Sequence, residues 1–332
     1  MSGVRHGATW LVLAGVVSVA PADAQQYLVV IGGIGGEARY QAAFSSQATR
    51  LVRVATERYA FPESHVMLLT EAPDRDGAQA RSTKDNIDLV LADLARRVEA
   101  DAQVFVVFIG HGSGVGGEAR LNIPGPDATA SDVASWLARF PSQQVVVAAL
   151  ASASGGFLAP LSHPNRVVVT ATRSVYERNE VLFAEHFVRA LTEDGADADK
   201  DDRISMLEAF HYARAEVERA YERENRLLTE HALLDDNGDG VASNDPSAPN
   251  ADGRLAARVA LGLAPGRGPA AVTDSVLAGL YARRERLRRE LDELRALRAN
   301  LDTEAYEAGL ERILLELART GRAIREREAG GG

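Results

Sequence analysis

Short runs of almost purely apolar residues alternate with longer amphipathic stretches over residues 25–191. The apolar runs occupy residues 27–31, 65–69, 104–109, 145–150 and 166–170. Because apolar residues are continuous in these runs, they are typical of strands that are covered on both faces. The amphipathic stretches predict helices over residues 41–59, 84–100 and 130–140. This order predicts an α/β domain of three layers with a mostly parallel sheet.

Two further helices are expected after this region, over residues 180–192 and 204–230. Stretches rich in Pro, Gly, Asn and Asp follow at 236–252, and Pro and Gly recur at 265–269, which is typical of loops around a short helix. We therefore expect the α/β domain to cover residues 25–235 and an acidic, Gly- and Pro-rich linker with a short helix to cover residues 236–271.

The C-terminal part of the chain, residues 272–328, is dense in Leu, Arg and Glu. Leu280, Leu287, Leu294 and Leu301 recur every seven residues, and Asp302 or Thr303 can begin a second helix after them. The pattern predicts a helical hairpin or a coiled coil. Two interpretations stay open: the helices pack on their own chain, or they form a coiled coil that makes a homodimer.

Residues 1–24 have the pattern of a secretory signal. A basic start precedes an apolar run over residues 10–20, and Ala22-Asp23-Ala24 forms an A-x-A cleavage site. The run is too short to span a bilayer, although a retained anchor is the alternative. No later stretch is long and apolar enough to cross a membrane. We expect export to the periplasm or outside the cell, with the mature chain beginning near Gln25.

Charge and cysteine content narrow the possible functions. The formal net charge is -10, from 37 basic and 47 acidic residues. This balance argues against a nucleic-acid partner, since phosphate contacts need a positive face, and it suits calcium better. The chain has no cysteine, so it has neither a disulfide nor a catalytic thiol.

Chemically capable residues follow two of the predicted strands. The run 104–109 leads into Gly110-His111-Gly112-Ser113-Gly114, and the run 145–150 leads into Ala151-Ser152-Ala153-Ser154-Gly155. The carboxyl ends of parallel strands meet at one edge of the sheet, where open α/β folds bind ligands. We therefore expect His111 and Ser152 to face one crevice.

These motifs, in this order, resemble the caspase-like fold of legumain-type cysteine peptidases over about residues 27–224. In that family a His-Gly histidine and the cysteine of a Cys-x-Ser-Gly turn form the catalytic dyad. The resemblance places His111, with Gly112 after it, at the histidine's position. It places Ser152 at the position of the cysteine.

Two other segments support the resemblance. The glycines of residues 32–36 and the step Arg39-Tyr40-Gln41 are similar to the start of the family's domain, and residues 170–174 are similar to its substrate-lining segment. If a peptide or protein ligand binds in the crevice, we expect Arg39, Ser113 and Arg173 to contact it.

The replacement of the thiol by a hydroxyl decides the chemistry that is open to this chain. A thiol with a pKa of about 8.5 is partly ionised at neutral pH, whereas a serine needs a base on its oxygen and a group that orients the base. Near His111, only Glu118 and Asp127 are candidates for that group, by proximity alone. Three functions stay open: a peptidase-like module that binds peptide or protein without cleaving it, a serine-dependent hydrolase using Ser152 and His111, and an unrelated function on this scaffold.

The acidic loop at residues 197–208 matches the ligand spacing of an EF-hand. The matching residues, from first to twelfth place, are Asp197, Asp199, Asp201, Arg203 through its carbonyl, Ser205 and Glu208. Asp202 takes the sixth place, where Gly is usual. We expect a structural calcium ion here; the alternative is that these acids only cap a helix.

A second acidic loop begins at Asp235. Asp235, Asn237 and Asp239 fill the first, third and fifth places, and Gly240 fills the sixth. Its twelfth place is Pro246, which offers no carboxylate. The loop is therefore half of a calcium site, which other residues could complete.

Overall fold

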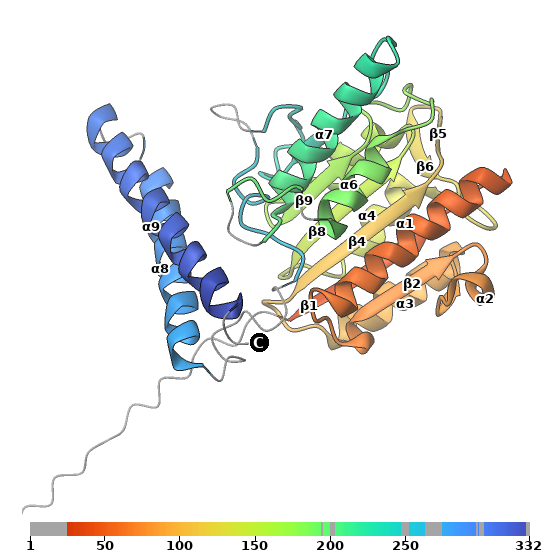
Figure 1. The fold of residues 1–332 in the computed structure, drawn as a ribbon. Coiled ribbons are helices and arrows are strands. Elements are labelled where there is room, and N and C mark those ends of the chain that lie inside the picture. Colours follow the sequence, from red (N-terminus) through yellow and green to blue (C-terminus); the bar gives the residue numbers. More distant parts are fainter. Residues whose placement is uncertain are drawn as a thin grey trace, which may run out of the picture.

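The computed structural model describes residues 25–193, 195–199, 203–246, 252–262, 274–296, 298 and 302–329. Its centre is a seven-stranded sheet in the order β10-β9-β8-β4-β1-β2-β3 (Figure 1). The strands are β1 (Gln26–Gly32), β2 (Val66–Thr70), β3 (Ala80–Arg81), β4 (Gln103–Gly110), β8 (Gln144–Ala151), β9 (Arg166–Thr170) and β10 (Leu233–Asp235). Neighbouring strands are parallel except for β10, which is antiparallel to β9. The prediction of an α/β domain with a mostly parallel sheet is confirmed.

Helices cover both faces of this sheet. One face is packed against α1 (Ala38–Glu57), α6 (Phe183–Thr192) and α7 (Met206–Arg223). The other is packed against α3 (Lys84–Arg97), α4 (Ala130–Leu137) and α5 (Leu158–Leu161). A single turn, α2 (Pro73–Asp76), follows β2. Within the described residues, the helices contain no stretch with both the length and the apolar character needed to cross a membrane.

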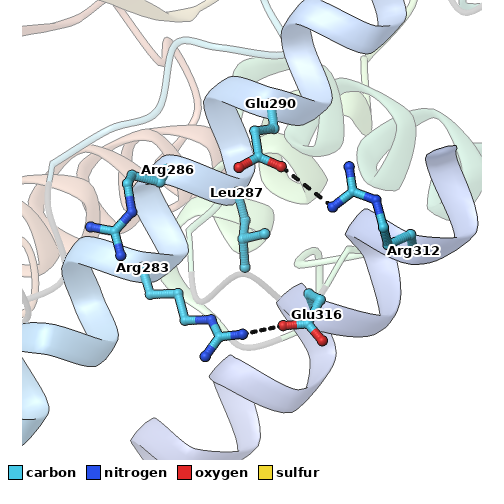
Figure 2. Close-up of a pocket in the computed structure, with 6 residues that line it drawn as sticks. All are labelled: Arg283, Arg286, Leu287, Glu290, Arg312 and Glu316. Atoms are coloured by element: carbon cyan, nitrogen blue, oxygen red, sulfur yellow. Dashed lines mark hydrogen bonds and ion pairs between the residues drawn. The ribbon is translucent and has the colours of Figure 1, made fainter.

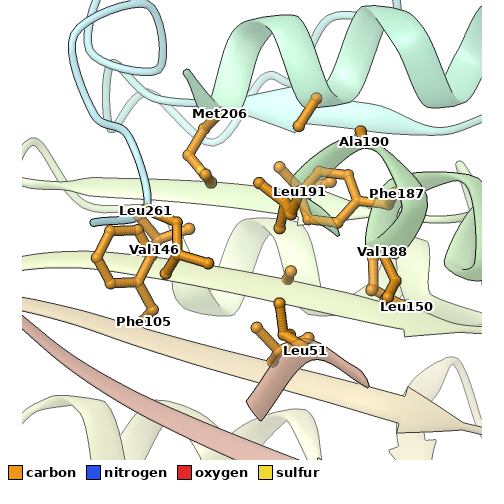
Figure 3. Close-up of a cluster of buried hydrophobic side chains, with 14 of the residues drawn as sticks. Leu51, Phe105, Val146, Leu150, Phe187, Val188, Ala190, Leu191, Met206 and Leu261 are labelled. Carbon is orange, nitrogen blue, oxygen red and sulfur yellow. The ribbon is translucent and has the colours of Figure 1, made fainter. Parts of the chain in front are cut away.

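The two helical layers explain why the strands read as continuous apolar runs. Leu28 and Val30 of β1 belong to the core on one side of the sheet, whereas Val29 and Ile31 belong to the core on the other side. Successive side chains of a strand point to opposite faces, so a strand that is covered on both faces needs apolar residues throughout. Figure 3 shows part of the first core, where Leu51 of α1 lies with residues of the sheet and of α6.

A second, small sheet lies beyond the end of β4. It has the order β5-β6-β7, with β5 (Gly112–Val115), β6 (Glu118–Leu121) and β7 (Ala128–Thr129), and its pairs are antiparallel. The sequence pattern did not predict it, because β5 is mostly glycine and β7 has only two residues. Its importance is positional: β5 begins directly after His111.

Helix α7 ends at Arg223 instead of continuing to residue 230. Asn225 adopts a left-handed backbone conformation with φ 50°, which asparagine tolerates better than most residues and which cannot continue a helix. The segment that was expected to be helical therefore runs, without helix, into β10.

Residues 252–262, which were expected to belong to a linker, pack against the α/β domain. Ala256, Val259 and Leu261 are buried in the same core as α1 and α6, and Leu261 appears there in Figure 3. The amide of Met206, at the start of α7, donates to the Val259 carbonyl at 2.8 Å. The domain therefore extends past residue 235.

Two helices, α8 (Ser275–Ala296) and α9 (Thr303–Ala329), lie side by side in the C-terminal part of the chain (Figure 1). A cavity of about 440 Å³ lies between them, and Figure 2 shows the residues that line it, which are charged except for Leu287: Arg283, Arg286, Leu287, Glu290, Arg312 and Glu316. Arg283 pairs with Glu316, and Arg312 lies 3.5 Å from Glu290. Such exposed ion pairs contribute little stability. A homodimer through these helices stays a prediction.

Candidate active-site rim

His111 and Ser152 lie at the same edge of the sheet. Strands β4 and β8 are neighbours, and the last pair in their register joins Gly110 to Ala151. His111 and Ser152 are the next residues of these two strands, so the structure brings together the two loops that the sequence paired. We call this edge, at the carboxyl ends of β1, β4, β8 and β9, the rim.

The Ser152 hydroxyl is bonded to the backbone of Gly112. Its Oγ accepts a hydrogen bond from the Gly112 amide at 3.2 Å and donates one to the Gly112 carbonyl at 3.0 Å. Ser152 is only 5% exposed. Within the described part of the chain, both partners of Oγ are thus backbone atoms. A carbonyl oxygen cannot take the proton of a nucleophile, so this contact does not activate the serine.

The His111 ring lies among aromatic side chains of α1. It meets Tyr40 and Phe44 edge to face, with ring centroids 4.6 Å and 5.0 Å away. Burial lowers the pKa of His111, against a hydrogen bond to the Gly35 backbone and the charges of Glu180 and Glu37, which raise it. The neutral imidazole is favoured. The sequence analysis did not predict this aromatic surrounding, although the positions of Tyr40 and Phe44, four residues apart on a helix, place them on one face.

Of the two carboxylates proposed to orient His111, Glu118 accepts a hydrogen bond from Ser131 at 3.0 Å instead. The carboxylates whose charges act on the His111 ring are Glu180 and Glu37. Glu180 reaches the site because it accepts a hydrogen bond from the Tyr40 hydroxyl at 2.9 Å. That bond is the main cause of the raised pKa of Tyr40.

Arg39 lies on the exposed side of Tyr40. Its guanidinium is 4.3 Å from the centre of the Tyr40 ring and donates to the Tyr40 hydroxyl at 2.8 Å. It also forms an ion pair with Glu37 at 3.1 Å, and its side chain is 66% exposed. Arg39 therefore presents a charge in a defined position close to His111.

Arg173 is held by Glu177. The Arg173 Nε lies 2.9 Å from one carboxylate oxygen of Glu177, and the Arg173 amide donates to the other at 3.1 Å. The same carboxylate bonds the ring of His231 at 2.6 Å and the His231 amide at 3.1 Å. The Glu177 carbonyl accepts from the amide of Ala153 at 2.7 Å. Glu177, which the sequence analysis missed, joins the turn after β8 to the segment before β10.

Ser154 fixes the turn that follows Ser152. Its fully buried hydroxyl accepts from the amides of Ala171 and Thr172 at 3.0 Å and 3.2 Å. Ala153 between the two serines has a left-handed backbone with φ 56°. A short 3-10 helix, η2 (Ser154–Phe157), continues the chain. Ser154 is therefore a structural residue of the turn.

Glycines allow the rim segments to approach one another closely. A Cβ at Gly112 would lie 2.1 Å from the Ser152 carbonyl oxygen, and a Cβ at Gly155 would lie 2.1 Å from the Arg173 carbonyl carbon. No side chain fits at such distances. Gly112 thus has a packing role, and Ser113, next to it in β5, is half-buried opposite Arg120.

In the first acidic loop, carboxylate oxygens of Asp197, Asp199 and Glu208 lie within 4.8 Å of one another. Glu208 also accepts from the amides of Ala198 and Ser205, both at 2.9 Å, and Ser205 caps α7. Asp201 lies outside the described residues. The arrangement is compatible with both interpretations, and a calcium ion at this loop, including ligation by the Arg203 carbonyl, stays a prediction.

In the second acidic loop, each predicted ligand side chain accepts a hydrogen bond from a loop amide. Asp235 accepts from Gly238 at 3.2 Å, Asn237 from Asp239 at 2.8 Å, and Asp239 from Val241 at 2.7 Å. This pattern folds the loop around its own side chains. Asp235 itself is buried at the end of β10.

The rim thus combines a buried serine, a neutral histidine among aromatic rings and two ordered arginines. Comparison of the chain with models of known protein families and with curated proteins finds no match.

Proposed function

We propose that this chain is a legumain-like peptidase homologue that binds a peptide or protein at the rim without cleaving it. The observation that carries the proposal is the state of Ser152: the residue is 5% exposed, and its hydroxyl is bonded twice to the backbone of Gly112. A nucleophile needs an exposed oxygen whose proton is shared with a base.

The surroundings of His111 support the same conclusion. A general base for serine should share a hydrogen bond with the hydroxyl and be oriented by a third group. The His111 ring instead contacts the rings of Tyr40 and Phe44, and the hydrogen-bonding group that acts on its pKa is the backbone of Gly35. In the family that the chain resembles, this histidine serves a thiol, which this chain lacks.

Side chains suited to protein recognition are exposed around the rim. Arg39 and Arg173 have side chains that are 66% and 60% exposed, and each is ordered by a neighbouring carboxylate. Tyr176, on the same segment as Arg173, is 78% exposed. Arginine and tyrosine are over-represented among the residues that contribute most to protein interfaces.

A serine-dependent hydrolase is the second candidate, and one observation favours it. Ala153 holds a left-handed conformation directly after Ser152, and strained residues of this kind concentrate at functional sites. A rearrangement that freed the Ser152 hydroxyl from Gly112 would be needed before attack.

A fluorophosphonate probe separates the two candidates. Wild-type protein and Ser152→Ala should both remain unlabelled from pH 5 to pH 8, because the hydroxyl is not activated. Labelling of the wild type that disappears in Ser152→Ala would establish the hydrolase instead.

Binding is tested with the full chain and a phage-displayed library of random peptides. The affinity of an enriched peptide should fall at least about fivefold in both Arg39→Ala and Arg173→Ala, which corresponds to about 1 kcal/mol. Arg96→Ala is the matched control, because Arg96 is an exposed, ion-paired arginine at the end of α3, on the side where β4 begins. Failure to enrich any peptide, or equal binding by all variants, would contradict the proposal.

A further inference from the structure

Strand β10 ends in a buried carboxylate oxygen that has no partner among the described residues. Asp235 is 1% exposed, and its Oδ1 accepts a hydrogen bond from Gly238 at 3.2 Å. Its Oδ2 is buried and makes no hydrogen bond with any described residue. Burying an unpaired ionised oxygen costs several kcal/mol, and such groups are usually paired or bound to a metal. We therefore expect a cation to bind beside the Asp235 carboxylate.

Other buried acids add to the negative charge. Asp236 and Asp252 are each 4% exposed. Asp252 accepts from the Asp236 amide at 3.0 Å, and Asp236 accepts from the amides of Gly253, Leu255 and Ala256. Within the described ranges, no lysine or arginine forms an ion pair with Asp235, Asp236 or Asp252.

The titration of Asp252 agrees with this accumulation of charge. Burial is the largest cause of its raised pKa, and the charges of Asp235, Asp236 and Asp239 raise the pKa further, against the hydrogen bond from the Asp236 amide. A cation beside these groups would favour the ionised carboxylate.

The loop supplies the geometry of an oxygen-ligand site. The Oδ1 of Asp239 accepts from the Val241 amide, and its Oδ2 accepts from the side-chain amide of Asn237 at 3.2 Å. Gly240 makes the sharp turn at the sixth place with φ 74°, and its amide donates to Ser162 at 2.9 Å. The loop is thereby fixed to the body of the domain. Side-chain and carbonyl oxygens at this spacing are the ligands that calcium prefers.

We propose that the loop at residues 235–241 binds a calcium ion through Asp235, Asn237, Asp239 and the Val241 carbonyl, with Asp252 supplying the charge that Pro246 cannot. Within the described residues, only Asp197, Asp199 and Glu208 bring three carboxylate oxygens within 4.8 Å of one another. We therefore assign Asp252 an electrostatic role and not direct ligation. This site goes beyond the proposed function of the rim.

The ion would join two segments of the chain. Asp236 and Asp252 connect the loop to residues 252–256, and the chain then delivers Val259 and Leu261 into the core. By balancing the charge of Asp236 and Asp252, the ion should stabilise the position of the segment 252–262. Calcium should therefore stabilise the folded domain.

The test uses the full chain after treatment with EDTA. Calcium chloride is added in a calorimetric titration, and melting is followed with and without calcium. Asp235→Asn should lose one equivalent of bound calcium and the corresponding rise in Tm. In EDTA the same variant should melt no lower than wild type, because it removes a buried charge while the asparagine oxygen can still accept from Gly238.

Two further variants separate this site from the first loop and from a purely structural role. Asp197→Asn should keep the equivalent that depends on Asp235, and Asp252→Asn should weaken its binding about tenfold, as expected for the loss of roughly 1.4 kcal/mol. Magnesium chloride should raise the Tm less than calcium chloride does. Calcium stoichiometry and a Tm rise in Asp235→Asn that equal those of wild type, or a wild-type Tm that millimolar calcium leaves unchanged, would overturn the inference.

Discussion

The Ser152 hydroxyl and the Gly112 backbone form two hydrogen bonds, of 3.2 Å and 3.0 Å, in opposite directions. Gly112 is the first residue of β5, and the preceding His111 carbonyl accepts from Asn122 on the other side, at 3.0 Å. Ser152 therefore satisfies the amide and the carbonyl at this end of β5, as the backbone of an adjacent strand would. This structural role is independent of any nucleophilic attack, and a thiol, a weak donor and acceptor, would fill it less well.

Replacing Ser152 should therefore cost stability. Ser152→Ala leaves the amide and carbonyl of Gly112 unpaired in a nearly buried place, so the free energy of unfolding should fall by about 1–3 kcal/mol. Urea denaturation followed by circular dichroism measures the change. Ser131→Ala removes an exposed hydroxyl that bonds Glu118 and should change the stability by less than about 0.5 kcal/mol. Equal stabilities of Ser152→Ala and wild type would contradict the structural role.

The close approach at the rim predicts a strong requirement for glycine. In Gly112→Ala and Gly155→Ala the new Cβ would meet backbone atoms at 2.1 Å, and relieving this overlap should cost at least about 1–3 kcal/mol. Gly279→Ala is the control, because Gly279 lies in helix α8, its φ is not positive and no atom lies within 4 Å of the added Cβ. This variant should be no less stable than wild type, since alanine is favoured over glycine inside a helix. If Gly155→Ala were as stable as Gly279→Ala, the packing at the rim would have to differ from that described.

Glu177 should control the order of the segment around Arg173. Glu177→Gln keeps the size of the side chain but loses the ion pair with Arg173 and the charge that binds His231. Hydrogen exchange should become faster at the amides of Arg173 and His231, which donate to this carboxylate. Glu193→Gln, which breaks an exposed ion pair with Arg189, should leave exchange at these amides unchanged. Unaltered exchange in Glu177→Gln would show that the backbone alone orders the segment.

One buried and two half-buried histidines predict a loss of stability in mild acid. Burial lowers the pKa of His111, His186 and His211 in the folded protein. The unfolded chain, with ordinary histidine pKa values near 6.5, then binds protons more readily than the folded protein does. The contribution of these histidines to the free energy of unfolding should be complete above about pH 6.5 and should decrease as the pH drops from there toward the folded-state pKa values.

The variant His186→Leu isolates one part of this effect, because the His186 Nδ1 is buried without a partner in the described chain. Its Tm should fall less than that of wild type between pH 7.5 and pH 5.5. The comparison is needed because Glu230 and Asp252, whose pKa values burial raises, change stability in the opposite direction. An equal fall in both proteins would exclude a contribution from His186.

The sequence predicts most of the sheet because the apolar run of a buried strand can be recognised from neighbouring residues alone. Every residue of β4 after Gln103 is buried, so the strand appears as an unbroken apolar run. Parallel order then places His111 and Ser152 together, since both follow strands that turn out to be neighbours. The helix start at Ser205 is also local, because its capping partner Glu208 is three residues away.

The remaining features depend on contacts between distant residues. Glu177 meets His231 across 54 positions, and neither residue belongs to a motif. Strand β5 has the sequence GSGV, which lacks the apolar pattern of a strand and is paired only because β6 lies beside it. The segment 252–262 resembles a linker in composition, and it enters the core because Asp236 binds its amides. No local pattern encodes these relationships.

Glu230 and His231, which precede β10, bond segments that lie near the rim. The carboxylate of Glu230 accepts from the amides of Leu182 and Phe183 at the start of α6, and His231 bonds Glu177. Asp235 lies at the other end of the same short strand. Strand β10 therefore lies between the residues that bond the Arg173 segment and the acidic loop. If a calcium ion at that loop changed the affinity of the rim for a peptide, the peptide would change the affinity for calcium by the same factor, because coupling between two binding equilibria is reciprocal.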